Sequence, residues 1–113
     1  MSCLFCKIVA GEIPSKAVYE DAELLAFEDI KPEAPVHVLV IPKRHISTMN
    51  DLQAGDDELV GSMIRRASLI AKERGIDRPG YRTVFNCNSN AGQTVFHIHL
   101  HLLGGRRFSW PPG

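Results

Sequence analysis

The spacing of apolar residues in the first half of the chain predicts short elements. Residues 4–10 have the pattern of one helical turn, which Gly11 ends. Residues 17–20 and 24–28 are short apolar runs separated by turn-forming residues, a pattern typical of a hairpin. A β-branched run follows at residues 36–41 and indicates a third strand.

The second half begins with the only long amphipathic segment, residues 57–74. Its apolar positions recur at helical spacing, its first turn is acidic and its last turn is basic, so the pattern predicts one long helix that ends at Gly75. Two further strands are predicted at residues 81–87 and 94–103, separated by a polar, glycine-containing loop.

Together these elements predict a single domain over residues 1–113 of the α+β class. We expect about five strands in a meandering, mostly antiparallel sheet, with one long helix and a short N-terminal helix. A single long helix covers only one face of a sheet. An apolar face or edge left uncovered would favour a homodimer.

Charge and composition narrow the classes of partner. Thirteen basic residues balance thirteen acidic ones, which argues against binding to nucleic acid or to an anionic membrane. No apolar run approaches the ~20 residues that span a bilayer. The N-terminus lacks the apolar core of a signal peptide, so we expect a cytoplasmic protein.

The strongest chemical signal is a row of alternating histidines, His97, His99 and His101. In an extended strand these three imidazoles share one face, and the aliphatic residues between them share the other. Imidazole near neutral pH can bind a metal or act as a nucleophile. The row therefore predicts either chemistry, with a set of hydrogen-bonded polar residues as the plainer alternative.

A polar loop precedes the histidine row. Residues 86–94 supply amides, hydroxyls and small side chains that suit a phosphate oxyanion, although the same composition is typical of an ordinary turn. Loop and histidines together indicate attack by an imidazole on phosphorus.

These segments resemble the histidine-triad (HIT) superfamily. Residues 97–103 match its motif His-φ-His-φ-His-φ-φ, and the similarity extends over residues 25–30, 34–46, 92–95 and the terminal Trp-Pro-Pro-Gly at 110–113. The terminal motif resembles the Hint branch, which comprises purine nucleoside phosphoramidases. The resemblance implies a HIT-like fold and hydrolysis of the P–N bond in AMP-amine substrates, through a nucleotidyl-histidine intermediate.

The resemblance also implies roles for the catalytic residues. His99 would be the nucleophile within the triad that His97 begins, and His101 would contact the phosphate. Thr94 occupies a position that is commonly serine in the family, near the leaving group. His37 matches a further active-site histidine that orients the triad, with a hydrogen-bonded residue of a buried strand as the alternative.

By the same resemblance, the nucleotide contacts a defined set of residues. The base cleft would be lined by Leu4, Phe5, Phe27, Ile30 and Leu39. Asp29 would accept the ribose hydroxyls, or else serve only as a turn former. The phosphate would be held by Asn86 and by N–H groups around Gly92, Gln93, Thr94 and Val95. Trp110 and the tail would lie near the partner subunit's active site.

A Cys-x-x-Cys pair, Cys3 and Cys6, is typical of a zinc site when two further ligands are available. His45 and His97 match the histidines of the structural zinc site in some HIT branches. A free cysteine pair and a reversible disulfide are the alternatives. No cofactor is expected to be needed for catalysis, and four protein ligands would make the zinc structural.

Two other functions compete with the phosphoramidase. One is a Fhit-like hydrolase of dinucleoside polyphosphates, against which the terminal motif argues. The other is a regulatory protein that binds nucleotide or zinc, with incidental catalysis. The intact triad favours an enzyme, whose partners would be purine nucleoside monophosphates and phosphoramidates.

Overall fold

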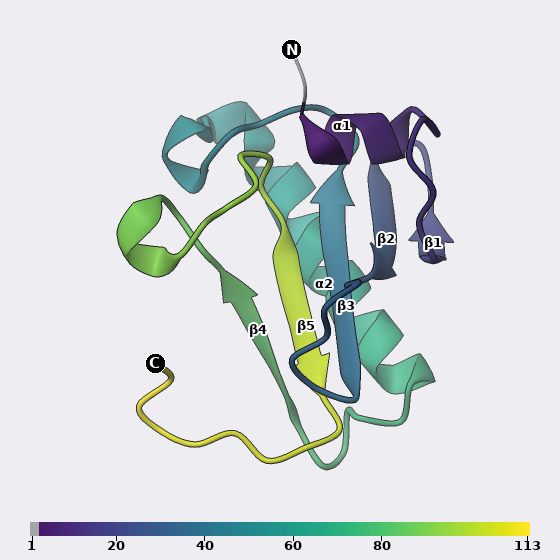
Figure 1. Cartoon of the computed structure of the whole chain (residues 1–113), viewed down its shortest axis with the longest axis vertical. Helices are drawn as coiled ribbons and strands as arrows, with labels where there is room; N and C mark the ends of the chain where they lie inside the picture. Colours follow the sequence, from purple (N-terminus) through teal and green to yellow (C-terminus); the bar gives the residue numbers. More distant parts are fainter. Residues whose placement is uncertain (1–2) are drawn as a thin grey trace.

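The computed structural model describes residues 3–113. Five antiparallel strands form one sheet in the order β1-β2-β3-β5-β4 (Figure 1). The strands are β1 (Ala17–Glu20), β2 (Leu24–Glu28), β3 (Val36–Pro42), β4 (Tyr81–Phe85) and β5 (Leu100–Gly104). The helices are α1 (Leu4–Val9) and α2 (Asp57–Glu73), with three short 3-10 turns in the connections. The predicted α+β class is confirmed.

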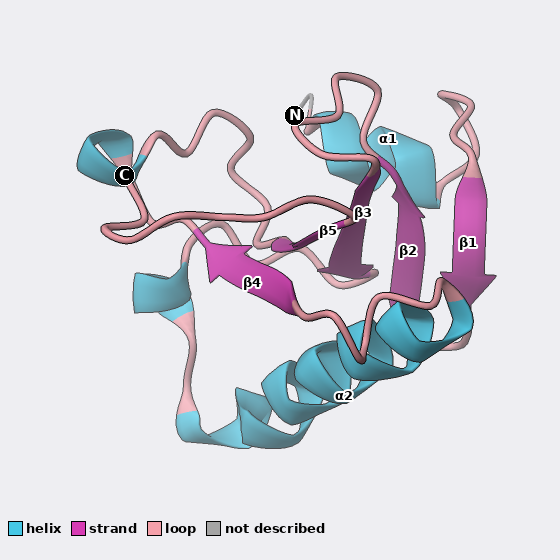
Figure 2. Cartoon of the chain, turned by 90° about the horizontal axis from the view of Figure 1, so that it is seen from below, coloured by secondary structure: helices cyan, strands magenta, loops and turns pink. Residues whose placement is uncertain are grey.

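The sheet is not a simple meander. The chain leaves β3, runs through α2 on one face, and returns to the far edge as β4 before β5 inserts between β3 and β4 (Figure 2). A helical crossover between β3 and β4 was visible in the order of predicted elements. The insertion of β5 beside β3 was not, because strand order depends on pairing between distant segments.

Helix α2 packs against one face of the sheet through the positions that helical spacing predicts. Its buried residues are Leu59, Met63, Ala67, Ile70 and Ala71. They contact alternate residues of the strands, among them Leu24, Val38 and Leu100. This is the main core of the molecule.

The opposite face carries a smaller apolar cluster under α1. Phe5 of α1 packs with Phe27 and Leu39, and all three are about 5% exposed or less. Strands β2 and β3 are therefore buried on both faces, which explains why their sequences are continuous apolar runs rather than alternating ones.

The histidine strand is shorter than predicted. β5 begins at Leu100, whereas residues 94–99 lie in an irregular approach to it. Its partner β3 ends at Pro42, which has no amide hydrogen to extend the ladder, and the Ile98 amide bonds instead to the Ile46 carbonyl at 2.8 Å. The alternation of faces is nevertheless confirmed, since Ile98 belongs to the main core.

Strand β4 also ends early, at Phe85 rather than at residue 87. Cys87, the last residue of the predicted strand 81–87, is partly exposed in the loop that follows β4. The polar sequence that follows favours the loop over further pairing.

Two glycines allow close packing where β5 ends. A Cβ on Gly104 would lie 2.5 Å from the Cδ1 atom of Ile76, and Gly105 has a φ of +88° beside Pro35. Larger residues at either position would displace the turn that follows β5. Within residues 3–113, no helix is long and apolar enough to cross a membrane.

Candidate active site

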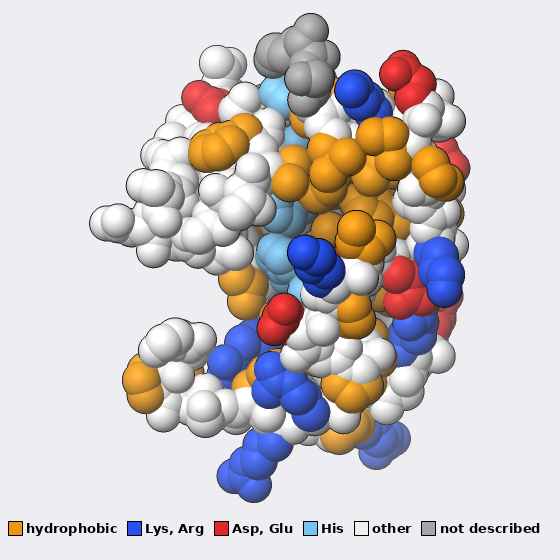
Figure 3. All heavy atoms as spheres, in the orientation of Figure 1, with side chains coloured by type: hydrophobic (Ala, Val, Ile, Leu, Met, Phe, Trp, Pro, Cys, Tyr) orange, Lys and Arg blue, Asp and Glu red, His pale blue; other side chains and the backbone are white. Residues whose placement is uncertain are grey.

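The histidine side chains line the floor of a groove on the face opposite α2. In Figure 3 they form a pale-blue column between an apolar wall and a lobe of polar side chains and backbone. The apolar wall belongs to the cluster of α1, β2 and β3, and the lobe to the segment between β4 and β5. The groove thus has an apolar wall and a polar wall, with a row of imidazoles between them.

His99 is held in one tautomer by the backbone. Its Nδ1 lies 2.8 Å from the carbonyl oxygen of His97, so Nδ1 carries the hydrogen and donates it. The Nε2 atom is then unprotonated and has no hydrogen-bond partner within residues 3–113. His99 is 9% exposed, and the Phe5 ring packs edge-on against it at 5.1 Å between centroids. The arrangement presents one lone pair to the groove.

A second chain of hydrogen bonds fixes His101. The Glu33 amide donates to His37 Nδ1 at 3.0 Å, which leaves the hydrogen of His37 on Nε2. That Nε2 lies 2.9 Å from His101 Nδ1 and 3.4 Å from Asp29 Oδ2. His37 therefore donates to His101, whose own hydrogen is placed on Nε2, facing away from His37.

Burial keeps these imidazoles neutral at neutral pH. It is the main cause that lowers the pKa of His37 and of His99. For His101, burial is joined by the charges of His99 and His37, and together they lower the pKa to about 4, with Asp29 opposing them. At neutral pH His37 is therefore uncharged, and its contact with Asp29 is not an ion pair. An unprotonated His99 is available as a nucleophile.

This shift predicts that acid destabilises the fold through His101. Between pH 6.5 and about 4 the unfolded chain binds a proton at His101 and the folded chain does not, so stability falls as pH falls through this window. One such group contributes at most about 1.4 kcal/mol per pH unit. Urea unfolding at pH 7 and pH 5 should show a smaller loss for His101→Asn than for the unsubstituted chain. Equal losses would contradict the buried, neutral state.

The polar loop is organised by its own hydrogen bonds. The Gly92 amide donates to the Ser89 carbonyl at 3.0 Å, and the Gln93 amide donates to the Asn88 carbonyl at 3.1 Å. These two amides, expected to hold phosphate oxygens, are therefore used within the loop. The amides of Thr94 and Val95 donate no bond inside the described chain and remain available to a ligand.

The side chain of Gln93 is a structural bridge. It is 6% exposed; its Oε1 accepts the Asn88 amide at 2.8 Å, and its Nε2 donates to the Ser47 and Val95 carbonyls at 2.9 and 3.1 Å. Asn86 is partly buried, and its side chain makes no hydrogen bond in the described part of the chain. Of these two side chains, that of Asn86 is the one left free for a phosphate.

The residues predicted for the base cleft are brought together only in part. Phe5, Phe27 and Leu39 form one cluster, against which Val95 packs. Leu4 is 44% exposed and lines a neighbouring hollow. Ile30 is 91% exposed, outside the cluster, on a hollow of about 610 Å³ with Lys16 and Glu28. As it stands, the groove has a phenylalanine wall without Ile30.

Asp29 forms a local turn, one of its two expected roles, and its position is compatible with the other. Its Oδ1 accepts the Lys31 amide at 2.8 Å in a local turn, and its Oδ2 faces His37. A carboxylate has about four lone-pair positions, so these contacts leave capacity for a ligand hydroxyl. The turn orients the carboxylate toward the histidines.

The two cysteines and two histidines predicted to bind zinc converge. The thiol sulfurs of Cys3 and Cys6 and the ring nitrogens of His45 and His97 all lie within 4.8 Å of one another. The Cys6 sulfur is 3.3 Å from His45 Nδ1 and 3.6 Å from His97 Nδ1. Tetrahedral zinc with bonds of 2.0–2.3 Å separates its ligands by about 3.5 Å, so the spacing fits the ion.

The tautomers at this cluster also fit a metal. His97 Nε2 lies 2.7 Å from the Pro42 carbonyl and must donate to it, so Nδ1 directs a lone pair at the cysteines. His45 Nε2 lies 3.1 Å from the Ser47 hydroxyl, with Nδ1 again toward the thiols. A second hydrogen bond of this kind is typical of metal-bound histidine.

Several contributors to the site were not predicted from the sequence. They act mainly through backbone groups: the Glu33 amide, the Pro42 carbonyl and the Ser47 carbonyl. Backbone partners leave no mark in residue identity, so no signal could have found the first two. Ser47 follows His45 by two residues, a spacing that places a hydroxyl beside the imidazole in an extended segment.

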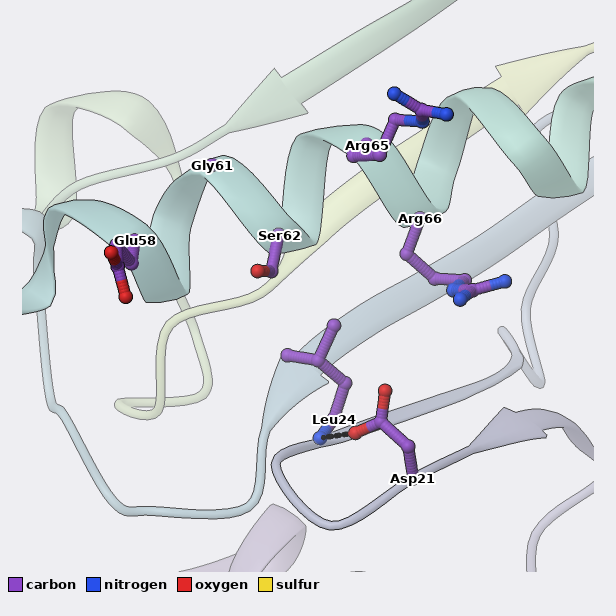
Figure 4. A pocket seen from close by; sticks show the side chains of 7 residues that line it. All are labelled: Asp21, Leu24, Glu58, Gly61, Ser62, Arg65 and Arg66. Carbon is purple, nitrogen blue, oxygen red and sulfur yellow. Dashed lines mark hydrogen bonds between the residues drawn. The ribbon is translucent and has the colours of Figure 1, made fainter.

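Another hollow lies between α2 and the turn that joins β1 to β2 (Figure 4). Its volume is about 410 Å³, and its lining includes Glu58, Ser62, Arg65 and Arg66. No histidine or cysteine lines it, and the Asp21 carboxylate is already bonded to the Leu24 amide at 2.8 Å. The histidine groove is therefore the better candidate for chemistry.

The sheet and the histidine groove define a histidine-triad domain. Comparison with known proteins agrees: the family described as "Scavenger mRNA decapping enzyme C-term binding" matches residues 2–108. A purine nucleoside phosphoramidase of Escherichia coli K12 is 50% identical over 103 residues, which cover 91% of this chain and 87% of that protein. The chain therefore belongs to the HIT family, as the resemblance predicted.

Solved structures give the same result. A HIT family hydrolase from Legionella pneumophila Philadelphia 1 has a TM-score of 0.98 and 56% identity, covering 99% of this chain and 100% of that one. A histidine triad protein from Clostridium difficile has a TM-score of 0.93 and 45% identity, covering 96% and 95%. Fold and sequence similarity thus extend over the whole described chain.

Proposed function

We propose that this protein is a hydrolase that cleaves the P–N bond of purine nucleoside phosphoramidates. The observation that carries the proposal is the free Nε2 lone pair of His99, fixed by the His97 carbonyl at 2.8 Å and directed into the groove. The 50% identical protein of E. coli is named a purine nucleoside phosphoramidase, which supports the same activity.

The reaction proceeds in two displacements at phosphorus. His99 Nε2 forms a bond to the α-phosphorus while the P–N bond breaks, and the departing nitrogen takes up a proton and leaves as the amine. Water then attacks the nucleotidyl-histidine, loses a proton, and releases the nucleoside monophosphate with His99 regenerated. Thr94, exposed at the groove, is the proposed hydrogen-bond donor to the leaving group.

The neighbouring residues stabilise the phosphate and orient the nucleotide. Three groups are the proposed hydrogen-bond donors to the phosphate: the Nε2–H of His101, the side-chain amide of Asn86 and the backbone amide of Val95. None of them donates a hydrogen bond elsewhere in residues 3–113. His37 is a positioning residue that fixes the tautomer of His101. Apolar contact with the purine comes from Phe5 and its cluster, and Asp29 accepts the ribose hydroxyls.

A comparison of substrates tests this assignment. Turnover of an adenosine 5′-phosphoramidate should exceed that of diadenosine polyphosphate by at least ~100-fold in kcat/KM, because the proposed site binds one nucleoside and releases a small amine. Steady-state kinetics on both substrates measure the ratio. A preference for the dinucleotide would establish the Fhit-like alternative instead.

We also propose that zinc binds at Cys3, Cys6, His45 and His97. The mutual spacing of the four ligand atoms, the tautomer of His97 and the direction of His45 Nδ1 support it. Four protein ligands leave no open position, so the metal would tie α1 to the sheet and not act on substrate. A cytoplasmic location, where thiols stay reduced, is part of the same proposal.

A homodimer through β4 is the proposed assembly. β4 is an edge strand that pairs only with β5 in the described sheet, so its outer backbone groups are free to pair with a second copy. Trp110 in the adjoining tail is 82% exposed and would become buried against the groove of the partner subunit. Light scattering should give the mass of two chains; the mass of one chain would exclude this assembly.

A further inference from the structure

We propose that Ser47 and Gln93 form a hydrogen-bonded strut through which a metal at the cysteine–histidine cluster strengthens nucleotide binding. The inference deepens the proposed function and rests on both of its sites. Three members of the cluster, Cys3, Cys6 and His45, are distant in sequence from the phosphate loop (residues 86–95), whereas His97 follows the loop by two residues. Ser47 and Gln93 join His45 to the loop by hydrogen bonds.

The strut begins at a metal ligand. The Nε2 atom of His45 lies 3.1 Å from the Ser47 hydroxyl, and its Nδ1 faces the thiols. With a metal at Nδ1 the hydrogen of His45 is on Nε2, which then donates to Ser47. The carbonyl of the same Ser47 accepts the Nε2–H of Gln93 at 2.9 Å. A ligand imidazole is therefore two hydrogen bonds from the loop.

Gln93 links Ser47 to the phosphate loop through hydrogen bonds of its side chain. Its Oε1 accepts the Asn88 amide, and its Nε2 also donates to the Val95 carbonyl, so it bonds to both ends of the loop. Because Gln93 is 6% exposed, water cannot replace a lost partner without cost. Movement of Ser47 thus moves the segment whose Val95 amide is proposed to meet the phosphate.

The same cluster contacts the nucleophile by a second, shorter route. His97 directs Nδ1 at Cys3 and Cys6, and its carbonyl holds the Nδ1–H of His99. Phe5 lies between the two cysteines in α1 and packs on the His99 ring. A metal that fixes His97 and α1 therefore also restrains His99 and the apolar wall.

The two sites share a wall as well as hydrogen bonds. A hollow of about 500 Å³ is lined by Cys3 and His45 of the cluster, by Ser47, and by Thr94 and Val95 of the loop. A ligand at one site makes the shared wall more rigid, so a ligand at the other site binds without the entropic cost of ordering that wall. Such coupling is reciprocal, so the nucleotide must strengthen metal binding by the same factor.

The test is a binding cycle with zinc and AMP. Zinc affinity is measured by competition with a chromogenic chelator, with and without saturating AMP, and AMP affinity is measured by calorimetry on zinc-loaded and chelated protein. A titration of chelator with AMP alone corrects for zinc held by the nucleotide. Circular dichroism confirms that the chelated protein is folded at the temperature used. We expect AMP to tighten zinc binding by at least ~5-fold, and zinc to tighten AMP binding equally.

Two variants locate the coupling in the strut. Ser47→Ala removes the hydroxyl beside His45, and Gln93→Met removes both ends of the bridge. Each should lower the coupling factor well below that of the unsubstituted protein while zinc and AMP still bind, and the route through His97 keeps the factor above one. Ser68→Ala, which removes a hydroxyl bonded to the Arg65 carbonyl on α2, should keep the original factor. If Gln93→Met does not fold, Ser47→Ala alone decides.

The outcomes separate this inference from the proposals beneath it. Tight binding of both ligands with a factor of one overturns the coupling and leaves the function standing. An undiminished factor in Ser47→Ala overturns the strut. Absence of zinc binding removes the metal site and the inference with it, and absence of AMP binding contradicts the proposed function.

Discussion

Replacing His99 with alanine should abolish phosphoramidate hydrolysis, by on the order of 10⁴-fold or more in kcat, because the reaction loses the atom that bonds to phosphorus. AMP affinity should change little, because His101, Asn86 and Val95 still donate their proposed hydrogen bonds to the phosphate. Steady-state kinetics and calorimetric titration with AMP measure the two quantities separately. The near-UV spectrum checks that the groove around Phe5 is intact.

The matched comparison is His37→Asn. That variant keeps the nucleophile but loses the donor to His101 Nδ1, so the tautomer of His101 is no longer fixed. We expect a smaller loss, on the order of 10²-fold, carried by kcat rather than by KM. If His99→Ala turned over substrate as well as His37→Asn does, His99 could not be the nucleophile.

Removing the proposed zinc should have the largest effect on stability. If free zinc stands about a thousandfold above its dissociation constant, bound metal adds about 4 kcal/mol to the free energy of unfolding. For a chain of this size that corresponds to a fall in Tm on the order of 15 °C after chelation. Cys6→Ser should reproduce most of that fall and lower the metal content measured by atomic emission.

Cys87→Ser provides the control for this experiment. Cys87 is also a partly exposed thiol, but it lies in the loop after β4 and outside the four-ligand cluster. Its replacement should leave the metal content unchanged, with a small effect on Tm. Metal content near zero in the unsubstituted protein, with the same Tm before and after chelation, would leave the cluster as a pair of free thiols beside two histidines.

The sequence predicted most of the fold because local signals agreed with one another. Helix α2 was expected over residues 57–74 and is found at Asp57–Glu73, with charges placed to suit its ends. The strands near residues 17–28 and 36–41 were also placed closely. What local signals could not supply was the order of the strands, which depends on β5 pairing with both β3 and β4.

The histidine row illustrates the same limit at the site. Alternation correctly placed Ile98 and Leu100 in the main core, with the imidazoles facing the other way. It also predicted a strand through His97 and His99, where the ladder has already ended at Pro42. Because His97 lies outside the regular strand, its carbonyl accepts the hydrogen bond from His99 Nδ1. In a regular ladder the carbonyl would accept a backbone amide of the neighbouring strand instead.

At three further positions the structure shows contacts that the sequence does not specify. The amides of Gly92 and Gln93 were expected at the phosphate, but the loop uses them itself, and Gln93 contributes through its side chain instead. Ile30 was expected beside the purine and is 91% exposed. Which backbone groups are already bonded is decided by loop conformation, and a motif alone does not specify it.

The central claim is that His99 forms a covalent bond to the nucleotide. Rapid acid-free quenching of the enzyme during turnover of an adenosine phosphoramidate, followed by peptide mass spectrometry, tests it directly. The account predicts one adenylyl group on the peptide that contains residues 97–101, attached to His99 and absent from His99→Ala. An adenylyl group on His97 or His101, or full turnover with no adenylated peptide under conditions that preserve a phosphoramidate bond, would contradict it.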